Sequence, residues 1–199
     1  MPYQTLRTLL LLLLMGLPAA AMAHVGLGDL SGGFRTGFLH PVSGLDHVIA
    51  MVAVGIWGAQ LGRPAIWMLP VTFPLVMTVG GVMGVLGLSL PGVEVGIALS
   101  ALVLGAMIAF ALRPPLWLAG VIVALFAICH GYAHGAELPE SANPLTFAVG
   151  FVLATGLLHA CGIALGVLYQ WRAGRYALRF GGTAIALGGV YFLNLAIAG

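Results

Sequence analysis

Residues 65–88 read AIWMLPVTFPLVMTVGGVMGVLGL, an apolar stretch without a charged side chain. A helix needs roughly 20 apolar residues to cross the hydrocarbon core of a bilayer, so this stretch is long enough to span a membrane. The whole 199-residue chain has the same character, with 61% hydrophobic and 6% charged residues and a mean hydropathy of +1.13. Soluble domains carry about 25% charged residues. The composition therefore predicts an all-α integral membrane protein and excludes a soluble enzyme, a nucleic-acid-binding protein and a disordered chain.

Five further apolar segments accompany this stretch, and short polar breaks separate them. The six predicted spans cover residues 41–60, 65–88, 92–112, 115–134, 145–169 and 179–198. Each segment is near the length that a membrane-spanning helix requires. We therefore expect residues 24–199 to form one domain, a six-transmembrane-helix bundle in the lipid bilayer.

The first 23 residues have the three parts of a cleavable secretory signal peptide. Arg7 supplies the positive charge, residues 9–14 are an unbroken leucine run, and a small-residue Ala-Met-Ala site ends at Ala23. Cleavage there would make His24 the mature N-terminus, on the outer side of the bacterial inner membrane. An uncleaved first helix is the alternative interpretation.

Cationic residues are distributed unevenly between the two ends of the predicted spans. If the mature N-terminus lies outside, the first, third and fifth breaks face the cytoplasm, and they hold Arg63, Arg113, Arg172, Arg175 and Arg179. The two outer breaks contain no arginine, and the second of them carries Glu137 and Glu140. The positive-inside rule then predicts a bundle with both termini outside.

Glycines recur at helical spacing in two predicted spans: Gly80, Gly81, Gly84 and Gly87 in the second, and Gly162 and Gly166 in the fifth. Small residues let helix backbones approach closely in lipid, so we expect tight packing within one bundle. Pro70 and Pro74 should bend the second span, because proline removes a helical hydrogen bond.

Polar residues gather in two clusters near the outer ends of spans, and the first is HPVSGLDH at residues 40–47. Pro41 suits the first position of a helix, where its missing N–H has no consequence. His40 would then lie at the helix mouth, with Asp46 and His47 roughly 8–9 Å further inward. A spacing of seven residues should place His40 and His47 on one face. Imidazoles and carboxylates suit borderline divalent cations, although Asp46 could instead hydrogen-bond His47 or a neighbouring helix end.

The second cluster is HGYAHGAE at residues 130–137. His130 and His134 are four residues apart, so they should stack on one helix face and can share one ion. His130 would lie roughly 6–8 Å below the outer surface, which is the level predicted for Asp46 and His47. The two clusters therefore predict an intramembrane metal site. The alternative is that these histidines are ordinary hydrogen-bonded core residues.

Two more histidines are candidates outside the clusters. His159 should lie roughly 21 Å along the fifth span, past the midplane, where it is either a second stop for an ion or a buried structural residue. His24, once exposed by cleavage, would offer its amine and its imidazole to a divalent ion, with Asp29 close by in sequence.

At this point the motifs support a family resemblance. The stretch at residues 40–47 resembles the HPxxGxDH signature of the HupE/UreJ family of hydrogenase and urease accessory membrane proteins, and residues 130–137 are similar to its second characteristic stretch. The resemblance extends over the whole mature chain. It implies a nickel permease, with cobalt as a second cargo, and no permanent cofactor. It also implies that the transported ion meets His40, Asp46, His47, His130, His134 and Glu137.

The sequence contains no P-loop, so we expect secondary or facilitated import without ATP hydrolysis. An intramembrane zinc-dependent hydrolase is the main alternative, since the His/Asp cluster and Ser43 could hold a catalytic zinc and its water. Against an enzyme, the HExxH pattern is absent, because Gly131 follows His130. A metal sensor is less favoured because the short loops leave little docking surface. Whether the chain forms a homo-oligomer is left open.

Overall fold

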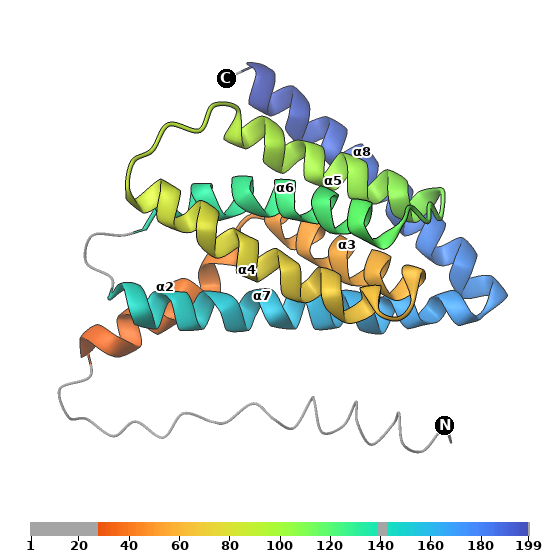
Figure 1. Cartoon of the computed structure of the whole chain (residues 1–199), viewed down its shortest axis with the longest axis horizontal. Coiled ribbons are helices and arrows are strands. Elements are labelled where there is room, and N and C mark those ends of the chain that lie inside the picture. Colours follow the sequence, from red (N-terminus) through yellow and green to blue (C-terminus); the bar gives the residue numbers. More distant parts are fainter. Residues whose placement is uncertain (1–27, 139–142, 199) are drawn as a thin grey trace.

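A computed structural model describes residues 28–138 and 143–198. Helices joined by short connections make up this part of the chain, and it contains no strand (Figure 1). The predicted signal peptide and His24 lie outside the described residues, as does the side chain of Asp29. The prediction of an all-α fold is confirmed.

Seven α-helices and one short 3-10 helix make up the described fold. They are α2 (Gly28–Ser43), α3 (Leu45–Leu61), α4 (Ala65–Val85), α5 (Val93–Ala109), α6 (Leu116–Ala136), α7 (Pro144–Gly166), η1 (Val167–Gln170) and α8 (Arg172–Ala198). Four of these segments are long and apolar enough to cross a membrane, namely α4, α6, α7 with η1, and α8. The bent pair α2–α3 brings the number to five, and α5 is a shorter apolar helix. The chain is therefore a multi-pass membrane protein.

The predicted first span, residues 41–60, is wrong at its beginning. Pro41 lies inside α2 and does not start a helix. The chain breaks instead at Gly44, which has extended backbone angles, and α3 begins at Leu45. The two helix axes meet at 81°. Inside α2, Pro41 removes one helical hydrogen bond, and the helix ends two residues later at Ser43.

The fifth polar break, between the predicted spans 145–169 and 179–198, is largely helical, because η1 extends to Gln170 and α8 begins at Arg172. Arginine can lie within a membrane helix near its end, since the long side chain reaches toward water or a neighbouring polar group. Arg179 does so, because its Nε donates a hydrogen bond to the carbonyl oxygen of Ala109 over 2.8 Å.

Glycines bring the helices into close contact, as the sequence predicted. An added Cβ at Gly80 or Gly84 of α4 would meet the carbonyl oxygen of Ile128 or Tyr132 in α6, and one at Gly131 would meet that of Met77. Gly162 packs in the same way against α3. Gly87 is the exception, since it has a positive φ of 65° in the turn after α4 and nothing packs against it.

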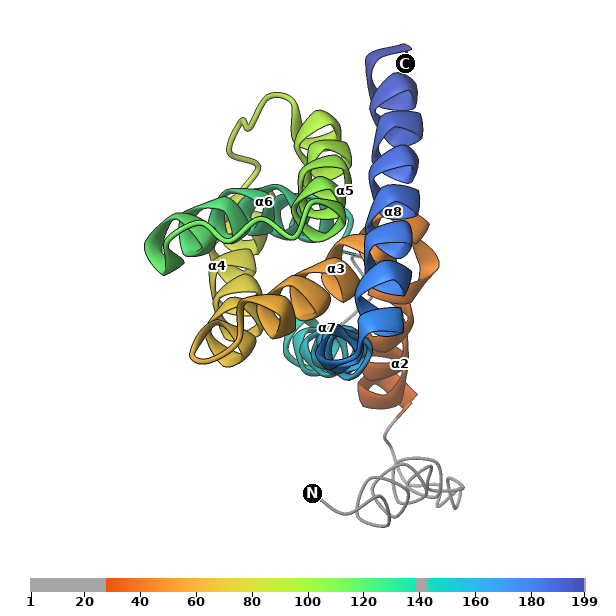
Figure 2. The same ribbon diagram turned by 90° about the vertical axis from the view of Figure 1, so that its right-hand side faces the viewer.

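Helix α3 occupies the centre of the bundle. Figure 2 shows it between the α4–α6 pair and α8, and it contacts α4, α5, α7 and α8. Its side chains Met51, Val54 and Trp57 are fully buried. Helix α3 begins beside the C-terminal end of α6, because the ring of His47 lies 4.8 Å from that of His130.

The two ends of the bundle differ in charge. The α3–α4, α5–α6 and α7–α8 connections lie at the same end (Figure 1). Those connections and the start of α8 carry five arginines: Arg63, Arg113, Arg172, Arg175 and Arg179. The C-terminal end of α6, with its histidines, lies at the opposite end (Figure 1).

Candidate metal centre

The sharp turn at Gly44 between α2 and α3, called the corner below, determines where the residues of the first polar cluster lie. His40 lies in the last turn of α2, whereas Asp46 lies in the first turn of α3. The expectation that His40 and His47 share one face of a straight helix is therefore wrong. A Cβ on residue 44 would lie 2.9 Å from Asp46 Oδ1 and 3.0 Å from His47 Nδ1, so a side chain there would press on the hydrogen-bonded Asp46–His47 pair.

Asp46 holds His47 in one orientation. Its Oδ1 accepts hydrogen bonds from Nδ1 and from the backbone N–H of His47, each over 2.8 Å. A carboxylate only accepts, so Nδ1 carries the proton and Nε2 keeps its lone pair. That Nε2 atom is buried and has no partner among the described residues. The structure therefore shows the alternative role of Asp46, a hydrogen bond to His47. Direct binding of a metal ion by Asp46 stays a prediction.

The histidines of α6 are arranged in a similar way. Nδ1 of His130 donates to the carbonyl oxygen of Phe126 over 2.9 Å, so Nε2 again carries the free lone pair. His130 is fully buried, and His134 is 6% exposed. In the described part of the chain, Nε2 of His130 and both ring nitrogens of His134 have no partner. Buried polar atoms normally find partners, so these nitrogens are candidate ligands.

The structure brings the two clusters together. The ring of His134 lies 4.8 Å from that of His40 and 4.5 Å from that of His47, measured between centroids. The rings of His47 and His130 are also 4.8 Å apart. Four imidazoles from α2, α3 and α6 therefore meet at one end of the bundle, and all four are candidate nitrogen ligands.

Glu137 closes the cluster at its outer side. One carboxylate oxygen lies 3.3 Å from Nε2 of His40, and the Glu137 side chain is 62% exposed. Ligand atoms of His40, His134 and Glu137 all lie within 4.8 Å of one another. Opposite ligands around one ion are about 4.2 Å apart when each bond is about 2.1 Å. A small inward movement would therefore let these three residues share one ion.

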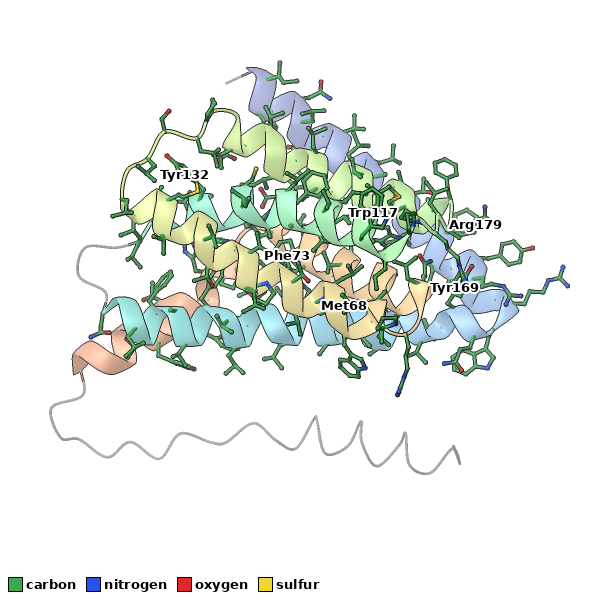
Figure 3. The ribbon with its side chains drawn as sticks, in the orientation of Figure 1. Met68, Phe73, Trp117, Tyr132, Tyr169 and Arg179 are labelled. Carbon is green, nitrogen blue, oxygen red and sulfur yellow. The ribbon has the colours of Figure 1, made fainter. Side chains whose placement is uncertain are left out.

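His159 does not join this cluster. It lies on α7, is 2% exposed, and both of its ring nitrogens lack partners among the described residues. The ring of Phe73 separates it from the cluster, because that ring lies 5.4 Å from the rings of both His130 and His159. Figure 3 places Phe73 near the middle of the bundle.

Several residues around the centre were missed by the sequence analysis. Phe147 and Phe151 of α7 contact the ring of His40, and Phe151 also contacts His134. Together with Thr155 and His159 they recur every four residues, so they form one face of α7. That spacing is visible in the sequence, and it could have identified the wall of the site.

An apolar pocket of about 320 Å³ lies beside His134, between α4, α6 and α7. Its lining includes Met77, Gly131, Phe147 and Phe151. A hydrated cation gains nothing from such a lining, because it offers few oxygen or nitrogen atoms. Glu137, by contrast, presents an exposed carboxylate beside His40.

The chemistry of the cluster suits a borderline divalent cation. Neutral imidazoles bind ions such as Ni²⁺, Co²⁺ and Zn²⁺ well, whereas Mg²⁺ and Ca²⁺ prefer oxygen. The two carboxylates, Asp46 and Glu137, would offset the charge of such an ion within a poorly solvated site. The arrangement can therefore bind a transition metal ion just below one end of the bundle.

Comparison with known proteins supplies independent information. A family model described as HupE / UreJ protein matches residues 11–192. Protein HupE of Rhizobium leguminosarum bv. viciae is 44% identical over 193 residues, covering 97% of this chain and 99% of that protein. No solved structure matches the chain significantly.

Proposed function

The chain belongs to the HupE/UreJ family, and on that premise we propose that it imports a divalent transition metal ion across the bacterial inner membrane. Ni²⁺ is the first candidate cargo and Co²⁺ the second. The imported metal would supply the maturation of hydrogenase or urease. In this role the ion is a substrate, and the protein needs no permanent cofactor.

The convergence of four imidazoles from three helices carries this proposal. His47 and His130 each have one nitrogen engaged in a hydrogen bond and the other free. Such outer hydrogen bonds orient metal-binding histidines and make them better ligands. We assign His40, His47, His130, His134 and Glu137 as ligands, and Asp46 as the residue that positions His47.

We propose six membrane crossings, with both termini outside. The bent pair α2–α3 would form one broken crossing, and α5 would form a short one. Non-helical backbone at membrane depth is tolerated where it lines a polar site, as the corner at Gly44 does. The five arginines at the opposite end support a cytoplasmic location for that end. Residues 1–23 would be removed as a signal peptide.

The proposed path runs from the outer cluster toward the arginine-rich end. His24, with Asp29, would capture the ion at the mature N-terminus, and His159 would receive it after the outer cluster. Two positive charges moving inward across 100 mV, inside negative, gain about 4.6 kcal/mol. Coupling to ATP is therefore not required for accumulation.

Radioactive nickel uptake into proteoliposomes with an inside-negative potential tests this function. We expect the His47→Ala and His134→Ala variants to lose at least about tenfold in initial uptake rate, because each removes a ligand. Thr183→Ala is the matched control, since this side chain is exposed on α8 and bonds only its own helix. Wild-type uptake rates in both histidine variants would contradict the proposal. Tightly retained zinc without nickel uptake would favour an intramembrane hydrolase instead.

A further inference from the structure

An unbroken series of ring contacts leads from the outer end of the bundle to its middle. The order is His40, His134, His47, His130, Phe73 and His159, and successive ring centroids are 4.5–5.4 Å apart. Phe73 alone in this series has no ligand atom. It is also fully buried. The ring therefore interrupts the line of imidazoles between His130 and His159.

Helix α7, which carries His159, has unsatisfied polar groups of its own. Both ring nitrogens of His159 and the hydroxyl of Thr155 are buried without partners in the described part of the chain. These two residues are four apart on α7 and so lie on the same face. His159 thus offers nitrogen ligand atoms just beyond the ring. They suit a cation that has passed Phe73.

Helix α4, which carries Phe73, lacks helical hydrogen bonds around this residue. Pro70 and Pro74 flank the residue inside α4. Proline has no N–H, so the carbonyl groups of Ile66 and Pro70 lose their usual helical partners. Further along, Gly80 and Gly84 hold α4 tightly against α6. The segment around Phe73 can therefore change its backbone angles while the outer half of α4 stays in place.

We propose that the Phe73 ring is a movable barrier between the outer histidine cluster and an inner metal-binding station at His159. An apolar ring across a polar path excludes water and hydrated ions until it moves aside. The proposal rests on the metal-import function proposed above and adds the residue that controls passage.

Substitutions that change the size of the side chain at position 73 test the barrier. We expect Phe73→Trp to reduce nickel uptake by about tenfold or more, while nickel affinity of the outer cluster changes less than about twofold. Phe73→Leu should keep most of the uptake, since it fills less space. Phe180→Trp is the matched control, because Phe180 is 76% exposed on α8. Wild-type uptake by Phe73→Trp would overturn the proposal.

Thiol labelling provides a readout that does not depend on transport. The background carries Cys129→Ser and Cys161→Ser, which remove both cysteines of the chain, and His159→Cys as the probe. A membrane-impermeant cationic thiosulfonate is added from the outer side or from the inner side. Adding Phe73→Ala should raise the outer labelling rate by about tenfold or more and leave the inner rate unchanged.

The two experiments separate failure of the barrier from failure of the function. Equal outer labelling rates with phenylalanine and alanine at position 73 would overturn the barrier, whatever the nickel uptake. Faster outer labelling with alanine supports the barrier even if nickel is not the cargo. Absent nickel uptake in the unmodified protein would contradict the import function alone.

Discussion

Oδ1 of Asp46 lies 2.8 Å from Nδ1 of the adjacent His47, at the first turn of α3. The hydrogen bond fixes the proton on Nδ1 and leaves Nε2 free, in a ring that lies 4.8 Å from that of His130 and 4.5 Å from that of His134. Asp46 thereby acts on the metal through His47. Its negative charge also lies near the positive end of the α3 dipole, which stabilises the ionised carboxylate.

This relationship predicts different results for two substitutions at Asp46. Asp46→Ala should weaken nickel binding by about 10–100-fold, because it removes the group that orients His47. Asp46→Asn keeps an oxygen that can accept from Nδ1, so the loss should be smaller. Nickel titration of the purified variants measures both affinities. Equal losses in the two variants would indicate that Asp46 binds the ion directly.

Glycine at position 44 should be needed for full nickel affinity. The Cβ of Gly44→Ala would press on Asp46 Oδ1 and His47 Nδ1 at 2.9 and 3.0 Å, so we expect about a tenfold loss of nickel affinity through displaced His47. The control is Gly32→Ala in α2, where an added Cβ meets nothing within 4 Å. Unchanged affinity in Gly44→Ala would show that the corner tolerates a side chain.

Close packing of α6 against α4 should make Gly131 sensitive to substitution. An added Cβ would overlap the carbonyl oxygen of Met77, and such overpacking lowers the free energy of unfolding by about 1–3 kcal/mol. Gly120→Ala on the same helix is the control, since an added Cβ there meets nothing within 4 Å. Thermal unfolding in detergent compares the two variants. Equal stabilities would contradict the packing of α4 on α6.

Competition between metal ions should follow the ligand chemistry of the cluster. Co²⁺, Zn²⁺ and Cu²⁺ should inhibit nickel uptake at concentrations similar to that of nickel, because imidazole ligands favour all of them. Mg²⁺ and Ca²⁺ should not inhibit even in about hundredfold excess, since they prefer oxygen ligands. Radioactive nickel uptake with each competitor measures this order. Strong inhibition by Mg²⁺ would indicate a mainly carboxylate site.

Much of the helical framework could be predicted from the sequence. Predicted spans 65–88 and 115–134 correspond to α4 (Ala65–Val85) and α6 (Leu116–Ala136). Agreement is close because an uninterrupted apolar run, ended by polar or turn-forming residues, determines where such a helix begins and ends.

The corner at Gly44 could not be predicted in the same way. Local sequence does not distinguish a proline that starts a helix from one that lies in its last turn. The direction of α2 depends on its packing against α7, where Gly37 meets the backbone of Phe147 and Gly150 meets that of Phe34. These contacts join residues far apart in the chain, so they leave no local pattern.

The histidines of the site could be predicted from the sequence, but their hydrogen bonds and the ring that lies beside them could not. Two polar clusters near the outer ends of spans indicated that their histidines could meet, because intramembrane polar residues usually face one another. The proton positions on His47 and His130 depend on hydrogen bonds that only the folded chain reveals. Phe73 is one of nine phenylalanines, and nothing in its spacing distinguishes it.

X-ray absorption at the nickel edge of the nickel-loaded protein tests the shared histidine site most directly. The predicted result is one tightly bound nickel per chain with scattering from three or four imidazoles. His134→Ala should lower the number of imidazoles around the ion and weaken nickel binding. His134 contacts both His40 and His47, so its loss should weaken the connection between the two polar clusters. A nickel ion surrounded by oxygen atoms alone, or unchanged by His134→Ala, would contradict the site.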